Sequence, residues 1–264
     1  MKSILIYLAM LLGVSAAASE HNVLSPAETA EGWRLLFDGQ TTEGWRNYRS
    51  RSIADGWQVV DGTLARVTAG AGDLVTIEQF GDFELAFEAL VETGGNSGVF
   101  FRADETQRFI FMSAPEIQIL DDANHRDGKN PLTSAGSNYA LHPAPRGLAR
   151  PAGEWNSFRV RVQGNHVVHW LNGQEIVNYQ LGSADWMERI AASKFADWPI
   201  YGTLERGYIG LQDHGDPVKF RNIKIRVLDG DSSPVVAAET FAERLGWPQG
   251  TRALILHVDD AGMS

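Results

Sequence analysis

Short stretches of alternating apolar and polar residues, separated by turn-forming residues, most strongly limit how this chain can fold. Residues 158–162 alternate without a break, and residues 166–171 follow after the triplet Gln163-Gly164-Asn165. The pairs Asp61-Gly62 and Asn172-Gly173 are suited to the positive φ angles of tight hairpin turns. Such a pattern predicts antiparallel β-sheets.

The fold class expected is all-β. Many short strands joined by Gly and Asn turns, with almost no helix, are typical of a β-sandwich or a barrel. The sandwich is favoured because several strands carry one apolar and one polar face, as strands of two packed sheets do. Residues 183–190 begin with a plausible cap, Ser183, and predict one short helix.

Composition excludes some classes of partner. The net charge is −10 and the pI about 5.2, and no basic patch is visible that would neutralise phosphates, which argues against nucleic acid and anionic membranes. The chain has no Cys, which excludes disulfides and a thiolate nucleophile. A neutral or cationic ligand is more compatible with this charge; no organic cofactor is expected, and the oligomeric state stays unknown.

The N-terminus predicts export. Residues 1–18 combine a basic start, an apolar run too short to span a membrane and an Ala-x-Ala site, which is typical of a signal peptide cleaved after Ala18. We therefore expect a periplasmic or extracellular protein with no membrane contact after cleavage. Residues 19–30 are expected to be a linker, 31–228 the sandwich, and 229–240 a second linker.

Strand parity selects the first candidate site residues. In residues 116–120, isoleucines fall on one face of an extended segment, and Glu116 and Gln118 fall on the other. The same alternation places Arg102, Gln212 and His214 opposite core-type residues of their own strands. If the three strands share a sheet, these five side chains line one surface.

A set of motifs carries a family likeness. In chain order they are Leu36-Phe37-Asp38-Gly39 with Gly44-Trp45, Trp57-x-Val59-x-Asp61-Gly62-x-Leu64, Gly94-x-Asn96-Ser97-Gly98-Val99-Phe100-Phe101-Arg102, Glu116-x-Gln118-Ile119-Leu120-Asp121, Gly153-Glu154-Trp155-Asn156, Leu211-Gln212-Asp213-His214-Gly215 and Phe220-Arg221-Asn222-Ile223. Together they resemble the 3-keto-disaccharide hydrolase domain over roughly residues 31–228. The resemblance implies a concanavalin-like jelly-roll sandwich of two antiparallel sheets and a secreted enzyme acting on glycosides oxidised at C3.

The chemistry of such a substrate suggests what a site needs. A ketone at C3 acidifies the hydrogen on C2, so that a base can remove it, the C1 substituent can leave by elimination, and water can add to the enone. This route needs a general base, an electropositive group at the enolate oxygen and an acid for the departing oxygen. A divalent metal on the ketone and a neighbouring hydroxyl would serve as the electrophile.

Roles follow for the strand residues. Glu116 is expected to act as base or metal ligand, His214 as acid, base or ligand, and Arg102, Gln118 and Gln212 to bind sugar oxygens. The alternatives are structural: Glu116 as a hydrogen-bonding residue of the sheet, His214 as a turn histidine held by a carboxylate, and Arg102 as the partner of an acidic neighbour.

Loop residues add weaker candidates. Asp121 and His125 are expected as further metal ligands, and Tyr139 and Lys194 as substrate-binding residues. For His125 the alternative is an ordinary solvated loop residue, and for Lys194 a surface salt bridge.

The C-terminal residues 241–264 suggest the start of a second domain. An apolar strand that ends at Asp259 and Asp260 resembles the first strand of the YdjC-like carbohydrate deacetylases, in which the paired acids act as base and metal ligand. We expect a truncated second domain here; the alternative is an acidic tail that docks on the sandwich.

Three functions remain open from the sequence. The leading one is an exported enzyme that cleaves 3-keto glycosides by elimination and hydration. The others are a non-catalytic carbohydrate-binding module and an ordinary glycoside hydrolase, because one sandwich architecture hosts many functions.

Overall fold

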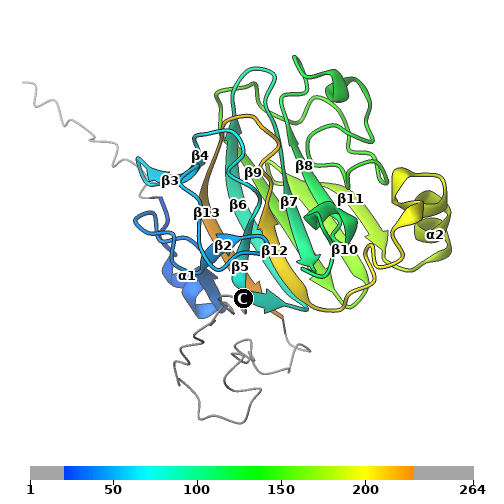
Figure 1. Ribbon diagram of the computed structural model, residues 1–264, viewed down its shortest axis with the longest axis horizontal. Coiled ribbons are helices and arrows are strands. Elements are labelled where there is room, and N and C mark those ends of the chain that lie inside the picture. Colours follow the sequence, from blue (N-terminus) through cyan, green and yellow to red (C-terminus); the bar gives the residue numbers. More distant parts are fainter. Residues whose placement is uncertain (1–20, 229–264) are drawn as a thin grey trace, which may run out of the picture.

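The computed structural model describes residues 21–228, which form two antiparallel β-sheets packed face to face (Figure 1). The larger sheet has eight strands in the order β11-β10-β9-β6-β13-β4-β3, with β1 paired to β13. The smaller sheet has five strands in the order β2-β5-β12-β7-β8. This arrangement confirms the expected all-β sandwich.

The strands are short, as the spacing of the turn residues predicted. Their bounds are β1 Trp33–Leu35, β2 Trp45–Asn47, β3 Trp57–Val60, β4 Thr63–Arg66, β5 Leu74–Phe80, β6 Phe83–Val91, β7 Asn96–Ala103, β8 Glu116–Leu120, β9 Asn156–Gln163, β10 His166–Leu171, β11 Gln174–Gln180, β12 Gly207–Leu211 and β13 Val218–Val227. The helical elements are α1 Pro26–Ala30, η1 Ile110–Met112, η2 Arg126–Lys129, α2 Ala184–Ala191 and η3 Lys194–Asp197.

The expected turns and the short helix are present. Asp61 and Asn172 have φ angles of 49° and 50°, and each precedes a glycine with positive φ, so both hairpins turn in the left-handed region. Ser183 caps α2 by accepting a hydrogen bond from Trp186 N at 3.1 Å.

The core lies between the sheets. Phe83 of β6 and Phe101 of β7 meet across the sandwich with ring centroids 6.5 Å apart, and Phe87 stacks on Phe158 at 5.1 Å. Ile117 belongs to the same cluster, so the apolar face of β8 points inward, as alternation predicted. The polar face of the five-stranded sheet is therefore turned outward.

The outward face of the five-stranded sheet is only partly covered. Residues 104–115, which contain η1, fold over part of it and pack Ile110 and Ala114 against Val75 and Phe100. The free edge of β8 is paired with residues 136–139, where Tyr139 N donates to Glu116 O at 3.0 Å. These two segments leave part of the polar face open between them.

Part of the expected N-terminal linker is ordered structure. Residues 26–30 form α1, whose first turn is closed by a capping box between Ser25 and Glu28. Asn22 donates its backbone N–H to Asn222 Oδ1 at 2.6 Å and its side-chain amide to Gly62 O at 2.9 Å. The linker prediction is wrong for this segment, because paired asparagines and a capped turn fasten it to the sheet.

The remaining predictions about the termini lie outside the described residues. These are the signal peptide, residues 19 and 20, the linker at 229–240 and the second-domain segment at 241–264. Within residues 21–228, no helix has the length and apolarity that crossing a bilayer requires.

Candidate functional site

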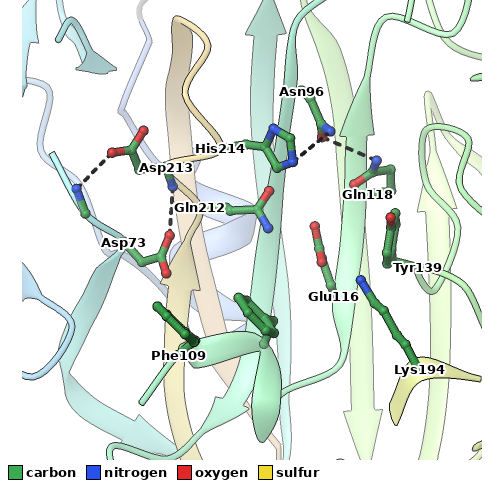
Figure 2. A pocket seen from close by; sticks show the side chains of 12 residues that line it. Asp73, Asn96, Phe109, Glu116, Gln118, Tyr139, Lys194, Gln212, Asp213 and His214 are labelled. Atoms are coloured by element: carbon green, nitrogen blue, oxygen red, sulfur yellow. Dashed lines mark hydrogen bonds between the residues drawn. The ribbon is translucent and has the colours of Figure 1, made fainter. Parts of the chain in front are cut away.

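A cavity of about 450 Å³ opens on the outward face of the five-stranded sheet (Figure 2). Its floor comes from β7, β8 and the end of β12, and its walls come from the segments that cover the sheet on either side. The residues that line it are Gly72, Asp73, Asn96, Phe109, Phe111, Glu116, Gln118, Tyr139, Lys194, Gln212, Asp213 and His214. Most of these residues are polar, and Phe109 and Phe111 add an apolar surface, a combination found in many small-molecule sites.

Glu116 is the most strongly perturbed acid of this cavity. Only 6% of the residue is exposed, and burial raises the pKa of its carboxyl to about 8; the negative charge of Asp73 adds to the rise, whereas Lys194 and the amide of Gln212 oppose it. The carboxyl is therefore mostly protonated at neutral pH. A pKa near the working pH suits a group that both gives and takes protons.

The amides of Gln118 and Asn96 lie between Glu116 and His214. Gln118 Nε2 lies 3.3 Å from Asn96 Oδ1, and Asn96 Nδ2 lies 3.3 Å from His214 Nε2 (Figure 2). With its amide turned over, Gln118 instead donates to Glu116 Oε1 and to Ser97 O, both at 3.2 Å, so the bonds to Asn96 and to Glu116 are alternatives. Burial lowers the pKa of His214, so its imidazole is neutral at pH 7 and Nε2 can accept a hydrogen bond from Asn96 Nδ2.

Lys194 and Tyr139 form the wall next to Glu116. Lys194 Nζ lies 4.5 Å from the centroid of the Tyr139 ring, and its charge lowers the pKa of Glu116. Burial raises the pKa of Tyr139, with smaller contributions from Asp127 and Glu116. Both residues line the cavity, so Lys194 is placed as a site cation facing the carboxyl.

Arg102 does not reach the cavity. Its guanidinium contacts Gly81 O at 3.1 Å and the Asp82 carboxylate at 3.0 Å, and only 3% of the residue is exposed. The pairing of β7 with β12 slips between Phe100 and Ala103, and Arg102 has a φ of 51°. This β-bulge inserts a residue and breaks the alternation on which the prediction rested. The placement of Arg102 beside the sugar was wrong.

Asp121 and His125 do not join Glu116. A strand rises about 3.3 Å per residue, which puts Asp121 roughly 17 Å along β8 from Glu116. Asp121 accepts hydrogen bonds from Gly94 N (2.8 Å) and Asn124 Nδ2 (2.7 Å), and His125 Nδ1 accepts one from Asp127 N (3.1 Å). Both side chains fasten the loop, and the three residues cannot share one ion.

The residues of the cavity do not fit a protein-held metal. Between residues 21 and 228, no group of three or more His, Asp or Glu side chains is placed to hold an ion. The expected divalent ion stays a prediction, and the chemistry below uses the side chains alone.

The same chain segment matches known proteins. The profile of the 3-keto-alpha-glucoside-1,2-lyase-like domain matches residues 32–226, a span that contains every residue of the cavity. The chain belongs to this family. A 3-keto-disaccharide hydrolase of Bacteroides thetaiotaomicron is 36% identical over 246 residues, which cover 81% of this chain and 85% of that protein.

Solved structures agree with this membership of the lyase-like family. One from Parabacteroides distasonis, described as a candidate glycosyl hydrolase, is 34% identical with a TM-score of 0.75 and covers 80% of this chain and all (100%) of that one. A second candidate glycosyl hydrolase from the same organism is 27% identical with a TM-score of 0.56, over 74% of this chain and 99% of that one.

The sequence analysis of this lyase-like domain missed one side of the cavity. Asp73 accepts a hydrogen bond from Asp213 N at 2.8 Å, and Asp213 pairs with Arg66 at 2.6 Å. Phe109 stacks on Phe111 with ring centroids 5.3 Å apart, and 45% of Phe109 is exposed. If the alternation of β5 is extended by one residue, to Asp73, the side chain of Asp73 falls on the outward face together with that of Val75. The two phenylalanines lie in a covering segment that parity does not describe.

Because Gly98 of the lyase-like domain has no side chain, it makes room for the carboxyl of Glu116. A Cβ at this position would overlap Glu116 Oε1 and lie 2.8 Å from its Cγ and Cδ. We expect Gly98→Ala to displace the carboxyl and to lower kcat/KM on the 3-keto glycoside of the reaction proposed below by about 10- to 100-fold, because a shift of about 1 Å can cost that much. Steady-state kinetics with a melting curve check this; a folded variant with full activity would contradict the placement.

Proposed function

We propose that this protein is a carbohydrate-active enzyme that cleaves 3-keto glycosides by removing the C2 proton, eliminating the C1 substituent and adding water. The observation that carries the proposal is Glu116, a fully buried carboxyl with a pKa of about 8 on the floor of a polar cavity. The family membership and the relative from Bacteroides thetaiotaomicron support the substrate class.

The cavity supplies the groups that elimination needs. Glu116 and Asp73 are carboxyls able to transfer protons. Lys194 brings a positive charge next to Glu116, which favours the negative charge that develops on the C3 oxygen. The amides of Gln118 and Gln212 can hold sugar hydroxyls; Gln212 Oε1 is buried with no hydrogen-bond partner in the described part of the chain.

A second function is favoured by one observation. Asp73 and Glu116 are a pair of carboxyls that line the cavity, and ordinary glycosidases act through such a pair on an oxocarbenium-like transition state. An ordinary glycosidase does not require a ketone at C3. The response to that ketone therefore separates the two functions.

The test compares matched substrates. Purified protein is given a nitrophenyl 3-keto-glucoside and the same glucoside without the ketone, and release of the aglycone is followed. We expect turnover of the 3-keto compound and at most about 1% of that rate on the other, since only the ketone acidifies C2. Equal rates would favour the ordinary glycosidase, and binding of either sugar without turnover would favour a binding module.

A further inference from the structure

Two carboxyls face one another across the cavity. Asp73 precedes β5 at one side of the cavity, and Glu116 lies on β8 at the other side. Gln212 lies between them (Figure 2). The charge of Asp73 reaches Glu116, because it contributes to the raised pKa of the Glu116 carboxyl. A sugar ring that fills the cavity would therefore lie between two acids.

The two carboxyls have different surroundings. Asp73 receives a backbone N–H from Asp213 at 2.8 Å, and nothing else among residues 21–228 donates to its second oxygen (Figure 2). Burial and the charge of Asp213 raise the pKa of Asp73 to about 6, and this hydrogen bond opposes the rise. No backbone N–H in the described part of the chain donates to the Glu116 carboxyl, which is fully buried. A donated N–H favours a carboxylate, and desolvation favours the acid.

The carboxylate of Asp213 is already paired and is not a candidate acid or base. Its carboxylate pairs with Arg66 and accepts Gly72 N at 2.8 Å, and its side chain is 5% exposed. It is a positioning residue that aims its own N–H at Asp73. At neutral pH Asp73 is thus mostly ionised and Glu116 mostly protonated, which is the usual arrangement of a base and an acid in one site.

We propose that Asp73 is the base that takes the C2 proton and that Glu116 is the acid that protonates the oxygen leaving C1. The inference rests on the proposed function. Asp73 takes the proton, the C2–H electron pair forms the C1=C2 bond, and the C1–O bond breaks as its oxygen takes the proton of Glu116. Water then adds to C1 and gives a proton to Glu116, while Asp73, whose proton has exchanged with solvent, gives a proton to C2. The 3-keto glycoside and water become 3-keto sugar and alcohol, and both carboxyls are restored.

Leaving-group chemistry separates the two roles. Glu116→Gln and Asp73→Asn are compared on a nitrophenyl 3-keto-glucoside, whose aglycone leaves without protonation, and on the methyl 3-keto-glucoside, whose aglycone needs an acid. Hydrogen exchange at C2 in D₂O is followed by NMR with each variant. Asp55→Asn, an exposed aspartate outside the cavity, is the control.

The expected patterns differ. Glu116→Gln stays within about 10-fold of wild type on the nitrophenyl compound, falls by about 100-fold or more on the methyl compound and still exchanges C2. Asp73→Asn falls by about 100-fold or more on both and loses exchange. If Asp73→Asn has a lowered melting temperature, Asp73→Ser is used instead, because the smaller serine side chain leaves room for water.

Other results overturn the assignment. The roles would be reversed if Glu116→Gln lost C2 exchange and Asp73→Asn kept activity on the nitrophenyl compound but not on the methyl compound. A folded Asp73→Asn variant with activity within about 3-fold of wild type on both compounds would remove Asp73 from the chemistry. A wild-type protein that releases neither aglycone fails at the earlier step, and contradicts the proposed function together with this inference.

Discussion

Replacing Glu116 with glutamine is expected to lower kcat on the methyl 3-keto-glucoside by about 10²- to 10⁴-fold, the range that a general acid or base contributes. Glutamine keeps the shape and hydrogen-bonding reach of the side chain but has no proton to transfer near neutral pH. Because the cavity and its other polar groups remain, KM should change little.

The measurement is a pH profile of kcat together with a melting curve. Wild type should lose activity as pH rises past about 8, where the carboxyl loses its proton, and the residual activity of Glu116→Gln should lack that limb. Glu43→Gln, an exposed acid away from the cavity, serves as the matched control. A Glu116→Gln variant with wild-type kcat and an unchanged profile would mean that the carboxyl does not take part.

The same substitution is expected to stabilise the fold at alkaline pH. The carboxyl has a pKa of about 8 in the folded state and an ordinary value of 4.5 when exposed. Between these values the unfolded chain has released a proton that the folded chain keeps, so the stability of wild type falls as pH rises. At about 1.4 kcal/mol for each pH unit, the loss is on the order of 3–5 kcal/mol by pH 8.

Denaturant unfolding of both proteins at pH 4.5, 6 and 8 measures this. Glu116→Gln should be close to wild type at the lowest pH and more stable by a few kcal/mol at the highest. Asp73 titrates in both proteins, so its contribution largely cancels in the difference. Parallel pH dependences for the two proteins would show that Glu116 is ionised in the folded state without cost.

Strand alternation predicted the floor of the site. Glu116, Gln118, Gln212 and His214 sit on regular strands or directly after one, so their parity was readable from neighbouring apolar residues. All four line the cavity. Arg102 shows where this reasoning fails, because a bulge inserts one residue and nothing in the local pattern announces it.

The walls of the cavity could not be predicted in the same way, because they depend on the folding of the long connections between strands. Asp121 and His125 are near Glu116 in sequence, but an extended strand carries the chain quickly away from its start, so their side chains form hydrogen bonds within the loop that follows β8. Phe109 enters the cavity because residues 104–115 turn back over the sheet, held by Ile110 in an apolar patch. Contacts of this kind are set by tertiary packing, and no periodicity in the sequence encodes them.

Solvent deuterium in the released sugar tests the central claim most directly. Wild-type protein is given a 3-keto-glucoside in D₂O, the reaction is stopped early by borohydride reduction, and the sugar is examined by NMR at C2. A sample of released 3-keto sugar kept without protein corrects for spontaneous exchange. Elimination followed by hydration predicts deuterium at C2 in each molecule released; hydrogen retained at C2 alongside aglycone release would contradict it.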